Sequence, residues 1–246
     1  MSAHHAEQDE SYFVSMTDLM VGMLFVFIIL LMAFALNLKE QETKLTQLDH
    51  AREEMLRDIE TALKNKGIPV TVLPESGVLR LPEQVLFDVN KAELQPEGLI
   101  AIGKLGEALD EILPCYAGDL EKPTCKGKAF GRLESVFVEG HTDDTGSPAR
   151  NWQLSYQRAR AVYIQLQETW PNLGEIRNDK NGQMGAGEKL IGVSGYADQR
   201  PINCTEGKDE CRKLNRRIDM RFIMAVPNPQ RQSQIDNALD PLPDVP

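Results

Sequence analysis

The chain has 246 residues, and its 27 basic and 37 acidic side chains give a formal net charge of −10 at pH 7. That length accommodates one full domain with flanking segments. The acidic balance argues against a nucleic-acid partner, because proteins that bind the phosphate backbone need a basic surface.

Residues 19–36 form one uninterrupted apolar run, LMVGMLFVFIILLMAFAL, without a charged side chain. As a helix this run spans about 27 Å at ~1.5 Å per residue, close to the ~30 Å hydrocarbon core of a bilayer. Apolar residues just before the run extend it back to Tyr12. We therefore predict a single transmembrane helix over residues 12–36, preceded by a short polar tail over residues 1–11.

A cleaved secretory signal is the alternative interpretation of the apolar run. The residues Ala33, Phe34 and Ala35 resemble a small-residue cleavage site. However, residues 1–38 contain neither Lys nor Arg, so the basic region that opens a secretory signal is missing. We expect the helix to remain as a membrane anchor.

Asp18 stands at the N-terminal edge of the apolar run. A carboxylate well inside a membrane helix costs on the order of 2.5 to 3.5 kcal/mol, so its position needs a reason. Two explanations are open. Either Asp18 caps a helix that begins at Leu19, at the water interface, or it is a functional group within the membrane.

The basic residues and the cysteines give opposite indications of topology. The first basic residues all follow the apolar run, and the positive-inside rule alone would place the C-terminal part in the cytoplasm. Four cysteines fall into two local pairs, which two loop-closing disulfides would explain in an oxidising compartment such as the periplasm. The predicted pairs are Cys115 with Cys125 and Cys204 with Cys211.

Free thiols or a zinc site are the alternatives for these cysteines. Neither pair has the C-x-x-C spacing of common zinc sites, and His141 is the only histidine beyond residue 50. We therefore expect no metal site in this chain.

Residues 37–66 contain neither Pro nor Gly and are predicted to continue as a juxtamembrane helix. Apolar residues recur there at a heptad-like spacing that Arg52 interrupts. They are Leu45, Leu48, Met55, Ile59 and Ala62. Such a helix could pair with a copy of itself or lie on its own domain, and the sequence leaves both open.

A domain of alternating strands and helices is predicted over residues 67–226. This alternation predicts an α/β sandwich, so the whole chain is of the α+β class, with a mixed sheet covered by helices. The polar, proline-rich residues 227–246 are predicted to be a disordered tail. The expected strands are 70–73, 78–81, 133–138, 190–193 and 218–224, and the expected helices are 96–112 and 154–167.

Residues 140–162, GHTDDTGSPARNWQLSYQRARAV, resemble the OmpA-like peptidoglycan-binding domain. That family has a strand ending in G-H/Y-T-D and a helix that opens with N-x-x-L-S-x-x-R-A. Segments 87–96, 195–201 and 215–219 match three further family motifs in the right order. The resemblance covers roughly residues 70–226. The insertion between Cys115 and Cys125 and the Tyr196-Ala197 pair depart from the family pattern.

The resemblance implies a site for diaminopimelate, which carries an ammonium and carboxylates at one tip of the stem peptide. The family's acid falls on Asp143 and its base on Arg158, which can hold a carboxylate in a bidentate fork. The other implied site residues are Asn151, Leu154, Thr142 and Arg217. The alternative is that Asp143 and Arg158 form only an internal ion pair, while Asn151 and Ser155 cap the helix. No catalytic set or cofactor motif competes, so we expect no enzyme and no cofactor.

The segment MTDLMVGMLF over residues 16–25, followed by such a domain, resembles the MotB group of stator subunits. This resemblance implies that Asp18 carries the ion, and that two copies of the chain form a homodimer inside a ring of MotA-like subunits. It also implies an inner-membrane protein with a cytoplasmic N-terminus and a periplasmic domain. That orientation agrees with the cysteines.

Within the MotB group, the chain looks more like the stator subunits of the Zorya anti-phage systems, with their ZorA-type ring subunits, than like flagellar MotB. Flagellar MotB has a basic N-terminal stretch, whereas the tail here is short and acidic. The resemblance therefore implies a proton-driven motor in phage defence. A flagellar-type stator and a passive peptidoglycan tether remain the alternatives, and the sequence does not distinguish protons from sodium ions.

Overall fold

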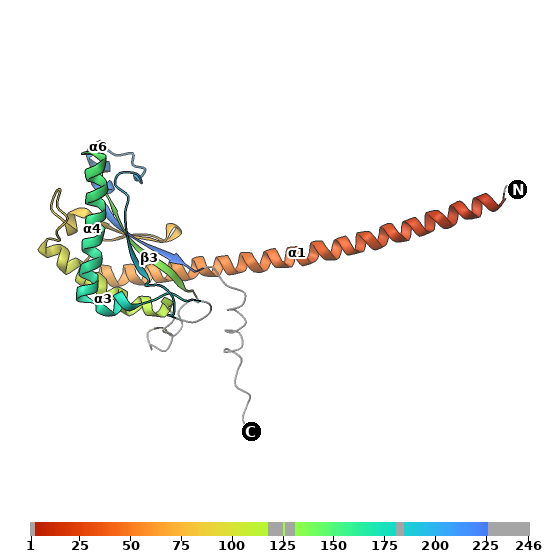
Figure 1. Cartoon of the computed structure of the whole chain (residues 1–246), viewed down its shortest axis with the longest axis horizontal. Coiled ribbons are helices and arrows are strands. Elements are labelled where there is room, and N and C mark those ends of the chain that lie inside the picture. The colour runs from red at the N-terminus through yellow and green to blue at the C-terminus, as the bar shows by residue number, and fades with distance from the viewer. Residues whose placement is uncertain (1–2, 118–124, 126–130, 181–184, 226–246) are drawn as a thin grey trace, which may run out of the picture. The chain divides into compact units, whose positions relative to one another are not determined.

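The computed structural model describes residues 3–117, 125, 131–180 and 185–225, so the predicted tail over residues 227–246 lies outside the described residues. The chain divides into two compact units, Met1–Thr46 and Gln47–Pro246. The division falls within the long helix α1, Ala3–Asn65 (Figure 1). The predicted domain bounds remain predictions, but the compact C-terminal unit begins twenty residues before position 67.

The N-terminal unit consists of the first part of α1. The segment from Met16 onward contains an 18-residue window with a mean hydropathy of 3.0 and is long and apolar enough to cross a membrane. Its described side chains are exposed as far as Thr43. Helical backbone begins at Ala3, so the segment predicted as a tail is largely helical, and Asp18 lies inside the helix rather than at its cap.

The C-terminal unit contains one five-stranded sheet in the order β1-β2-β5-β3-β4. All neighbouring strands are antiparallel except β3 and β4, which are parallel. The five predicted strands are confirmed, and the chain is α+β. Their bounds are β1, Thr71–Leu73; β2, Val78–Pro82; β3, Leu133–His141; β4, Ile191–Gly195; and β5, Arg217–Met224.

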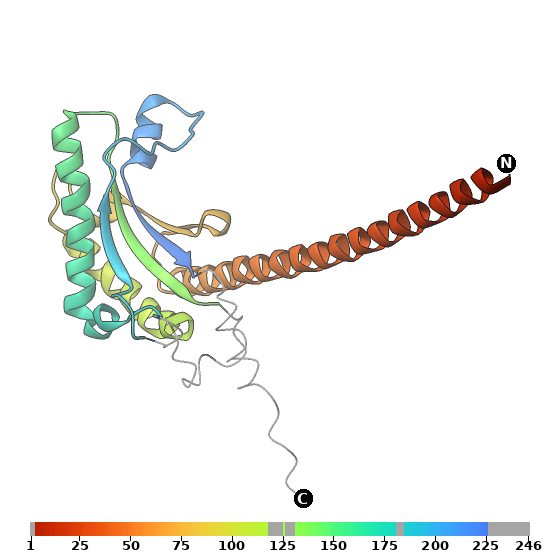
Figure 2. The same ribbon diagram turned by 45° about the vertical axis from the view of Figure 1, so that its right-hand side comes forward.

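Two long helices cover one face of this sheet, as predicted. Figure 2 shows α4, Pro148–Thr169, running along the sheet, and α3, Pro96–Ala117, packs against α4. Alternate residues of the central strands, such as Val138 and Met220, point into this layer and are buried. The intervening residues of the same strands point to the opposite face, because side chains alternate along a strand.

The last turns of α1 belong to the core of the C-terminal unit. Arg52, which interrupts the apolar pattern, donates from Nε and Nη2 to the carbonyls of Pro74 (3.2 Å) and Glu75 (3.3 Å), in the turn after β1. This part of α1 therefore lies on its own domain, one of the two alternatives left open. Its completely buried residues are Ala51, Met55, Leu56, Ile59 and Leu63.

Two glycines of α3 allow close packing, although glycine disfavours a helix. A Cβ at Gly98 would lie 2.5 Å from the carbonyl oxygen of Leu86, and one at Gly106 would lie 2.2 Å from Cδ1 of Trp170. A packing requirement therefore outweighs helix propensity at these two positions.

Three short helices were not predicted: α2, Glu83–Leu86; α5, Pro171–Glu175; and α6, Lys208–Asn215. They are too short to show a helical repeat of apolar residues, and α6 has no buried residue. Helix α4 begins six residues earlier than predicted, because Ser147 caps it and accepts a hydrogen bond from the backbone nitrogen of Arg150 at 3.4 Å.

Both predicted disulfides are present. Cys115 is bonded to Cys125, with 5.1 Å between their Cα atoms, and Cys204 is bonded to Cys211, with 5.6 Å. The second bond closes the loop that contains the first turn of α6.

Candidate functional site

The candidate site lies where β3 ends and α4 begins. Two motif glycines let α4 approach the sheet, since a Cβ at Gly140 would lie only 1.9 Å from the carbonyl oxygen of Ser155, and one at Gly195 would lie 2.7 Å from the nitrogen of Tyr156. The hydroxyl of Ser155 accepts a hydrogen bond from the backbone nitrogen of Ala197 at 3.0 Å. These motif residues therefore position the helix.

Asp143 follows β3 and is surrounded by donors. Its Oδ1 accepts from the backbone nitrogen of Thr145 at 2.9 Å and from the Thr145 hydroxyl, while its Oδ2 lies 2.6 Å from Nη1 of Arg216. Burial alone would raise the pKa of Asp143, but the hydrogen bonds from Thr145 and Arg216 outweigh burial and lower the pKa below its ordinary value. Asp143 is therefore an anion at neutral pH.

Arg158 projects from α4 and is almost completely buried. Its Nη2 lies 2.5 Å from Oε1 of Glu83, and its Nε donates to the carbonyl of Lys91 at 2.8 Å. Its Nη2 also donates to the carbonyl of Asp88 at 3.4 Å. The carbonyl groups of Asp88 and Lys91 thus hold the guanidinium together with Glu83.

Asp143 and Arg158 are connected through two other residues, and the described contacts include no direct pair between them. Oε2 of Glu83 lies 3.3 Å from Nε of Arg216, which in turn pairs with Asp143. The result is an alternating chain of acids and bases, Asp143–Arg216–Glu83–Arg158, which we call the charge relay chain. Its two acids and two bases balance, so it carries no net charge.

The members of the charge relay chain differ in their exposure to solvent. The side chain of Arg216 is 35% exposed, whereas those of Asp143 and Arg158 are only 7% and 2% exposed. Burial raises the pKa of Glu83, although Arg158 and Arg216 oppose this rise. Arg216 is thus the guanidinium that a ligand in solution meets first.

No local sequence pattern points to Glu83 or Arg216. Arg216 stands in the motif over residues 215–219, but the family resemblance implies Arg217 as the site residue of that motif. Glu83 lies in the unpredicted helix α2, sixty residues before Asp143, and no local pattern connects the two.

The remaining predicted residues differ in their placement. The side-chain nitrogen of Asn151 donates to the carbonyl of Asp143 at 3.3 Å, so Asn151 fixes the loop that carries the acid. The backbone nitrogen of Thr142 donates to the carbonyl of Ala197 at 2.9 Å, and its buried hydroxyl has no described hydrogen-bond partner. Leu154 is partly buried on α4.

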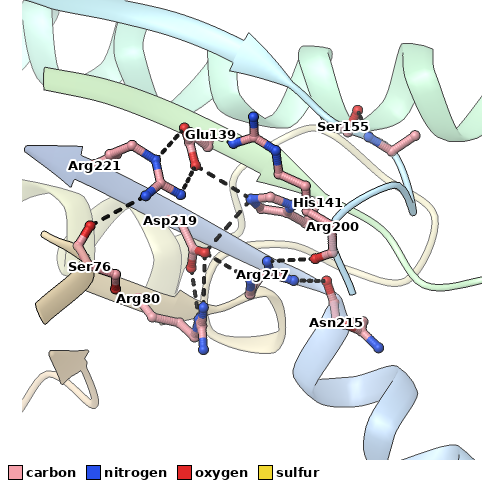
Figure 3. A network of polar contacts seen from close by, with 11 residues as sticks. Ser76, Arg80, Glu139, His141, Ser155, Arg200, Asn215, Arg217, Asp219 and Arg221 are labelled. Carbon is pink, nitrogen blue, oxygen red and sulfur yellow. Dashed lines mark hydrogen bonds and ion pairs between the residues drawn. The ribbon is translucent and has the colours of Figure 1, made fainter. Parts of the chain in front are cut away.

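Arg217 lies apart from the charge relay chain, in a network on the face of the sheet away from α4. Its Nε lies 2.9 Å from Oδ2 of Asp219, and its Nη2 donates to the carbonyl of Arg200 at 3.0 Å (Figure 3). Arg217 stays a predicted ligand residue, but its side chain lies apart from that of Arg216, because the side chains of adjacent residues in extended backbone point in opposite directions.

The network around Asp219 is built from facing residues of β2, β5 and β3, where Arg80, Asp219 and Glu139 form one row. Arg80 holds Asp219 through two contacts of 2.9 and 3.1 Å, and Arg221 holds Glu139 through two of 2.8 and 2.9 Å (Figure 3). Each acid is therefore neutralised by a bidentate guanidinium.

His141 lies between the two acids of this network. Its Nε2 is 3.9 Å from Oε2 of Glu139 and 3.7 Å from Oδ2 of Asp219. Its ring stacks on Tyr196, with 5.6 Å between the ring centroids. Burial lowers the pKa of His141, and this effect outweighs the opposing influence of Glu139. His141 is therefore uncharged at neutral pH and contributes to the packing on this face of the sheet.

A second acid of the motif, Asp144, contacts α6. Its Oδ1 lies 2.7 Å from Nε of Arg212, and its Oδ2 lies 3.9 Å from Nζ of Lys208. The disulfide between Cys204 and Cys211 joins the first turn of the helix that carries these bases to the loop before it. The disulfide loop thus borders the charge relay chain.

The sequence of this chain is similar to those of several known proteins. Residues 126–214 match the OmpA family. Zorya protein ZorB from Escherichia coli (strain ATCC 8739) is 27% identical over 88% of this chain and 89% of its own length. A second Zorya protein ZorB, from Escherichia coli O139:H28 (strain E24377A), is 23% identical over 94% of this chain and 88% of its own length.

A solved structure supports the fold. The crystal structure of a MotB-like protein from Desulfovibrio vulgaris superimposes with a TM-score of 0.50 and 19% identity, covering 73% of this chain and 98% of that one. The C-terminal domain is therefore OmpA-like in fold, and the chain as a whole is similar to ZorB proteins along nearly nine-tenths of its length.

Proposed function

We propose that this chain is the peptidoglycan-anchored stator subunit of a proton-driven membrane motor that acts in anti-phage defence. The observation that carries the proposal is the presence in one chain of an acid inside an apolar helix, at Asp18, and of the charge relay chain in an OmpA-like domain. Similarity to ZorB over nearly nine-tenths of the chain supports the combination.

Anchoring would occur by exchange of an internal ion pair for two ligand contacts. The tip of a diaminopimelate stem peptide carries an ammonium and a carboxylate. The ammonium would take the place of Arg216 beside Asp143, and the carboxylate would bind the guanidinium of Arg216. Because the ligand tip and the displaced pair are both neutral overall, no uncompensated charge is left in the site.

In this arrangement Arg158 does not contact the ligand itself. Through Glu83 it holds Arg216 in place, with contacts of 2.5 Å and 3.3 Å along the charge relay chain. The guanidinium of Arg158 is almost completely buried and is already held by Glu83 and by the carbonyls of Asp88 and Lys91. Arg158 is thus a positioning residue for Arg216 in the geometry described.

The motor function rests on Asp18. A carboxyl group inside the membrane can accept a proton on one side and release it on the other, and each charge that crosses 100 mV releases about 2.3 kcal/mol. A MotA-like, ZorA-type ring would use this energy to turn around a homodimer of the present chain. The domain, with its two disulfides, would lie in the periplasm and the N-terminus in the cytoplasm.

The test uses cells that carry the complete native operon and measures phage plaquing together with co-sedimentation of the protein with purified peptidoglycan. We expect Asp18→Asn to abolish protection and leave sedimentation intact. Asp143→Asn should abolish both. Glu168→Gln, an exposed change on α4, is the control.

The membrane level of each variant is measured in parallel by immunoblotting. Unchanged protection with Asp18→Asn at a normal membrane level would contradict the motor and favour the passive tether. Unchanged sedimentation with Asp143→Asn would contradict the anchor.

A further inference from the structure

Helix α6 packs no side chain into the core. None of its eight residues is buried, and Leu214, its one large apolar residue, is exposed. An isolated helix shorter than about 12 to 15 residues is marginal in water, so α6 needs another source of stability. The disulfide between Cys204 and Cys211 supplies a covalent one, because it ties the first turn of α6 to the loop before it.

Two polar contacts join α6 to neighbouring loops. Asp144, in the loop after β3, lies 2.7 Å from Nε of Arg212. Near the end of the helix, Oδ1 of Asn215 accepts a hydrogen bond from the backbone nitrogen of Ile202 at 2.7 Å. Ile202 lies two residues before Cys204 in the same loop. The disulfide therefore holds in place both the helix and the loop that the second contact needs.

Arg216 follows directly on the last residue of α6. Its backbone nitrogen donates to the carbonyl of Arg212 at 3.0 Å, and its own carbonyl accepts from the backbone nitrogen of Glu83 at 3.2 Å. The last turn of α6 thus fixes the backbone of Arg216 on one side, and Glu83 fixes it on the other. Because the side chain is 35% exposed, its direction depends on this backbone placement.

We propose that the disulfide between Cys204 and Cys211 positions Arg216, so that binding of the stem peptide depends on the oxidation of this bond. The inference rests on the proposed function, in which Arg216 binds the carboxylate of diaminopimelate. With the bond intact, α6 stays folded and Arg216 is in place before the ligand arrives. With the bond open, α6 frays and Arg216 has to be ordered during binding, which lowers the affinity.

The two disulfides differ in their access to a reductant. Cys115 and Cys125 are each only 5% exposed, whereas Cys204 and Cys211 are partly exposed. A dithiol reductant attacks through its thiolate and breaks the S–S bond. Each cysteine gains one electron and one proton, and the dithiol is oxidised to a disulfide. The more exposed bond should react first, so mild reduction should weaken peptide binding while the buried disulfide remains intact.

The test compares the two cysteine pairs in the full chain in detergent. One variant combines Cys204→Ala with Cys211→Ala, and the matched control combines Cys115→Ala with Cys125→Ala. Calorimetry measures binding of two free stem peptides, one with diaminopimelate and one with lysine in its place. The first variant should bind the diaminopimelate peptide about tenfold more weakly, the loss expected for roughly one charge-assisted hydrogen bond.

The lysine peptide shows whether the effect is selective. It has no carboxylate beside its ammonium, so loss of the disulfide between Cys204 and Cys211 should not weaken its binding. The control pair should leave the ratio of the two affinities unchanged, even where it lowers the melting temperature. An unchanged affinity for the diaminopimelate peptide, or an equal loss for both peptides, would overturn the proposal.

A second background shows whether the disulfide acts through Arg216. In a chain that already carries Arg216→Ala, removal of Cys204 and Cys211 should cause no further loss of binding, because both changes remove the same contact. If the tenfold loss persists in this background, the disulfide acts by another route and the proposal is wrong.

Hydrogen exchange without ligand separates this outcome from a failure of the anchor. Opening of the disulfide should speed exchange at the amides of residue 211 and Arg216 and leave that of Met220 in β5 unchanged. Asp143→Asn should weaken both peptides if the anchor assignment is right. If it weakens neither while exchange at Arg216 still rises, the anchor fails and the disulfide keeps its role in holding Arg216. Unchanged exchange at Arg216 would overturn the inference itself.

Discussion

Glu83 has two basic partners and little contact with water, which makes it the residue on which the charge relay chain depends. Replacement by Gln would leave Arg158 buried with no carboxylate to neutralise it. Removal of one partner of a buried pair costs roughly 3 to 5 kcal/mol, so we expect Glu83→Gln to lower the free energy of unfolding by about that amount.

The measurement is denaturant unfolding of the full chain in detergent, followed by fluorescence. Glu175→Gln serves as the comparison, because Glu175 pairs with Lys189 at the exposed surface and its loss should change little. Equal effects of the two substitutions would contradict the assigned role of Glu83.

His141 predicts a pH dependence of stability. Its pKa is lowered in the folded state by burial, so the unfolded chain binds the proton more readily. The contribution of neutral His141 is therefore fully present above its unfolded pKa of about 6.5 and is lost as the pH falls through its folded pKa. Glu139 and Asp219 also have lowered pKa values and lose their contribution at still lower pH.

We expect the melting temperature to fall between pH 7 and pH 5, and His141→Asn to remove that part of the decline. His50→Asn, at an exposed position on α1, is the control and should leave the decline unchanged. A wild-type melting temperature that stays constant from pH 7 to pH 5 would refute the assignment.

The motif resemblance places Asp143 after a strand and Asn151 near the start of a helix, and the structure has both there, because a strand end followed by a helix start is local information. It could not decide between Arg216 and Arg217, since Arg216 stands just before β5 and the side chains of adjacent residues in extended backbone point in opposite directions. Glu83 could not be found from sequence, because its role depends on a contact between distant elements.

At the scale of elements, the packing of α4 on β3 depends on the absence of a side chain at Gly140. A methyl group there would overlap the carbonyl of Ser155, so the helix would have to move away from the strand. We expect Gly140→Ala to destabilise the domain by about 1 to 3 kcal/mol, the usual range for overpacking, and to weaken peptidoglycan binding.

Gly103→Ala provides the matched control. Gly103 lies in α3 with open space around its Cα, so an added methyl group meets no neighbour. This substitution should leave stability unchanged or raise it by about 0.5 to 1 kcal/mol, because alanine favours the helix. Both variants are measured by thermal unfolding, and a larger loss for Gly103→Ala would refute the packing account.

The long elements were predictable because each repeats a burial pattern over many residues. The strands and α3 follow such patterns, with α3 extending five residues beyond its predicted end. Helix α6 shows no apolar face, and a disulfide and surface ion pairs hold it. Periodicity carries no information about an element of that kind.

At the scale of the molecule, the compact C-terminal unit includes the end of α1. A fragment that begins at residue 47 retains Met55, Ile59 and Leu63 in its core, whereas one that begins at residue 67 exposes the apolar surface that they cover. We expect the first fragment to unfold cooperatively and the second to unfold at markedly lower denaturant concentration or to aggregate.

Circular dichroism during urea titration would compare the two fragments. Equal midpoints would show that the end of α1 contributes nothing to the core. The sequence alone left this open, because a heptad-like spacing serves a helix dimer and an amphipathic surface helix equally well.

The ion pair between Asp143 and Arg216 also bears on which bacteria this chain could serve. In the proposed anchoring, a cell wall whose stem peptides carry lysine offers the ammonium without the neighbouring carboxylate. It would displace Arg216 from Asp143 and leave Arg216 and Arg158 to share the single carboxylate of Glu83. Transfer of the gene into such a species would yield a protein that reaches the membrane but does not bind the cell wall. In the proposed function, the composition of the recipient's wall would thus limit the spread of the defence system.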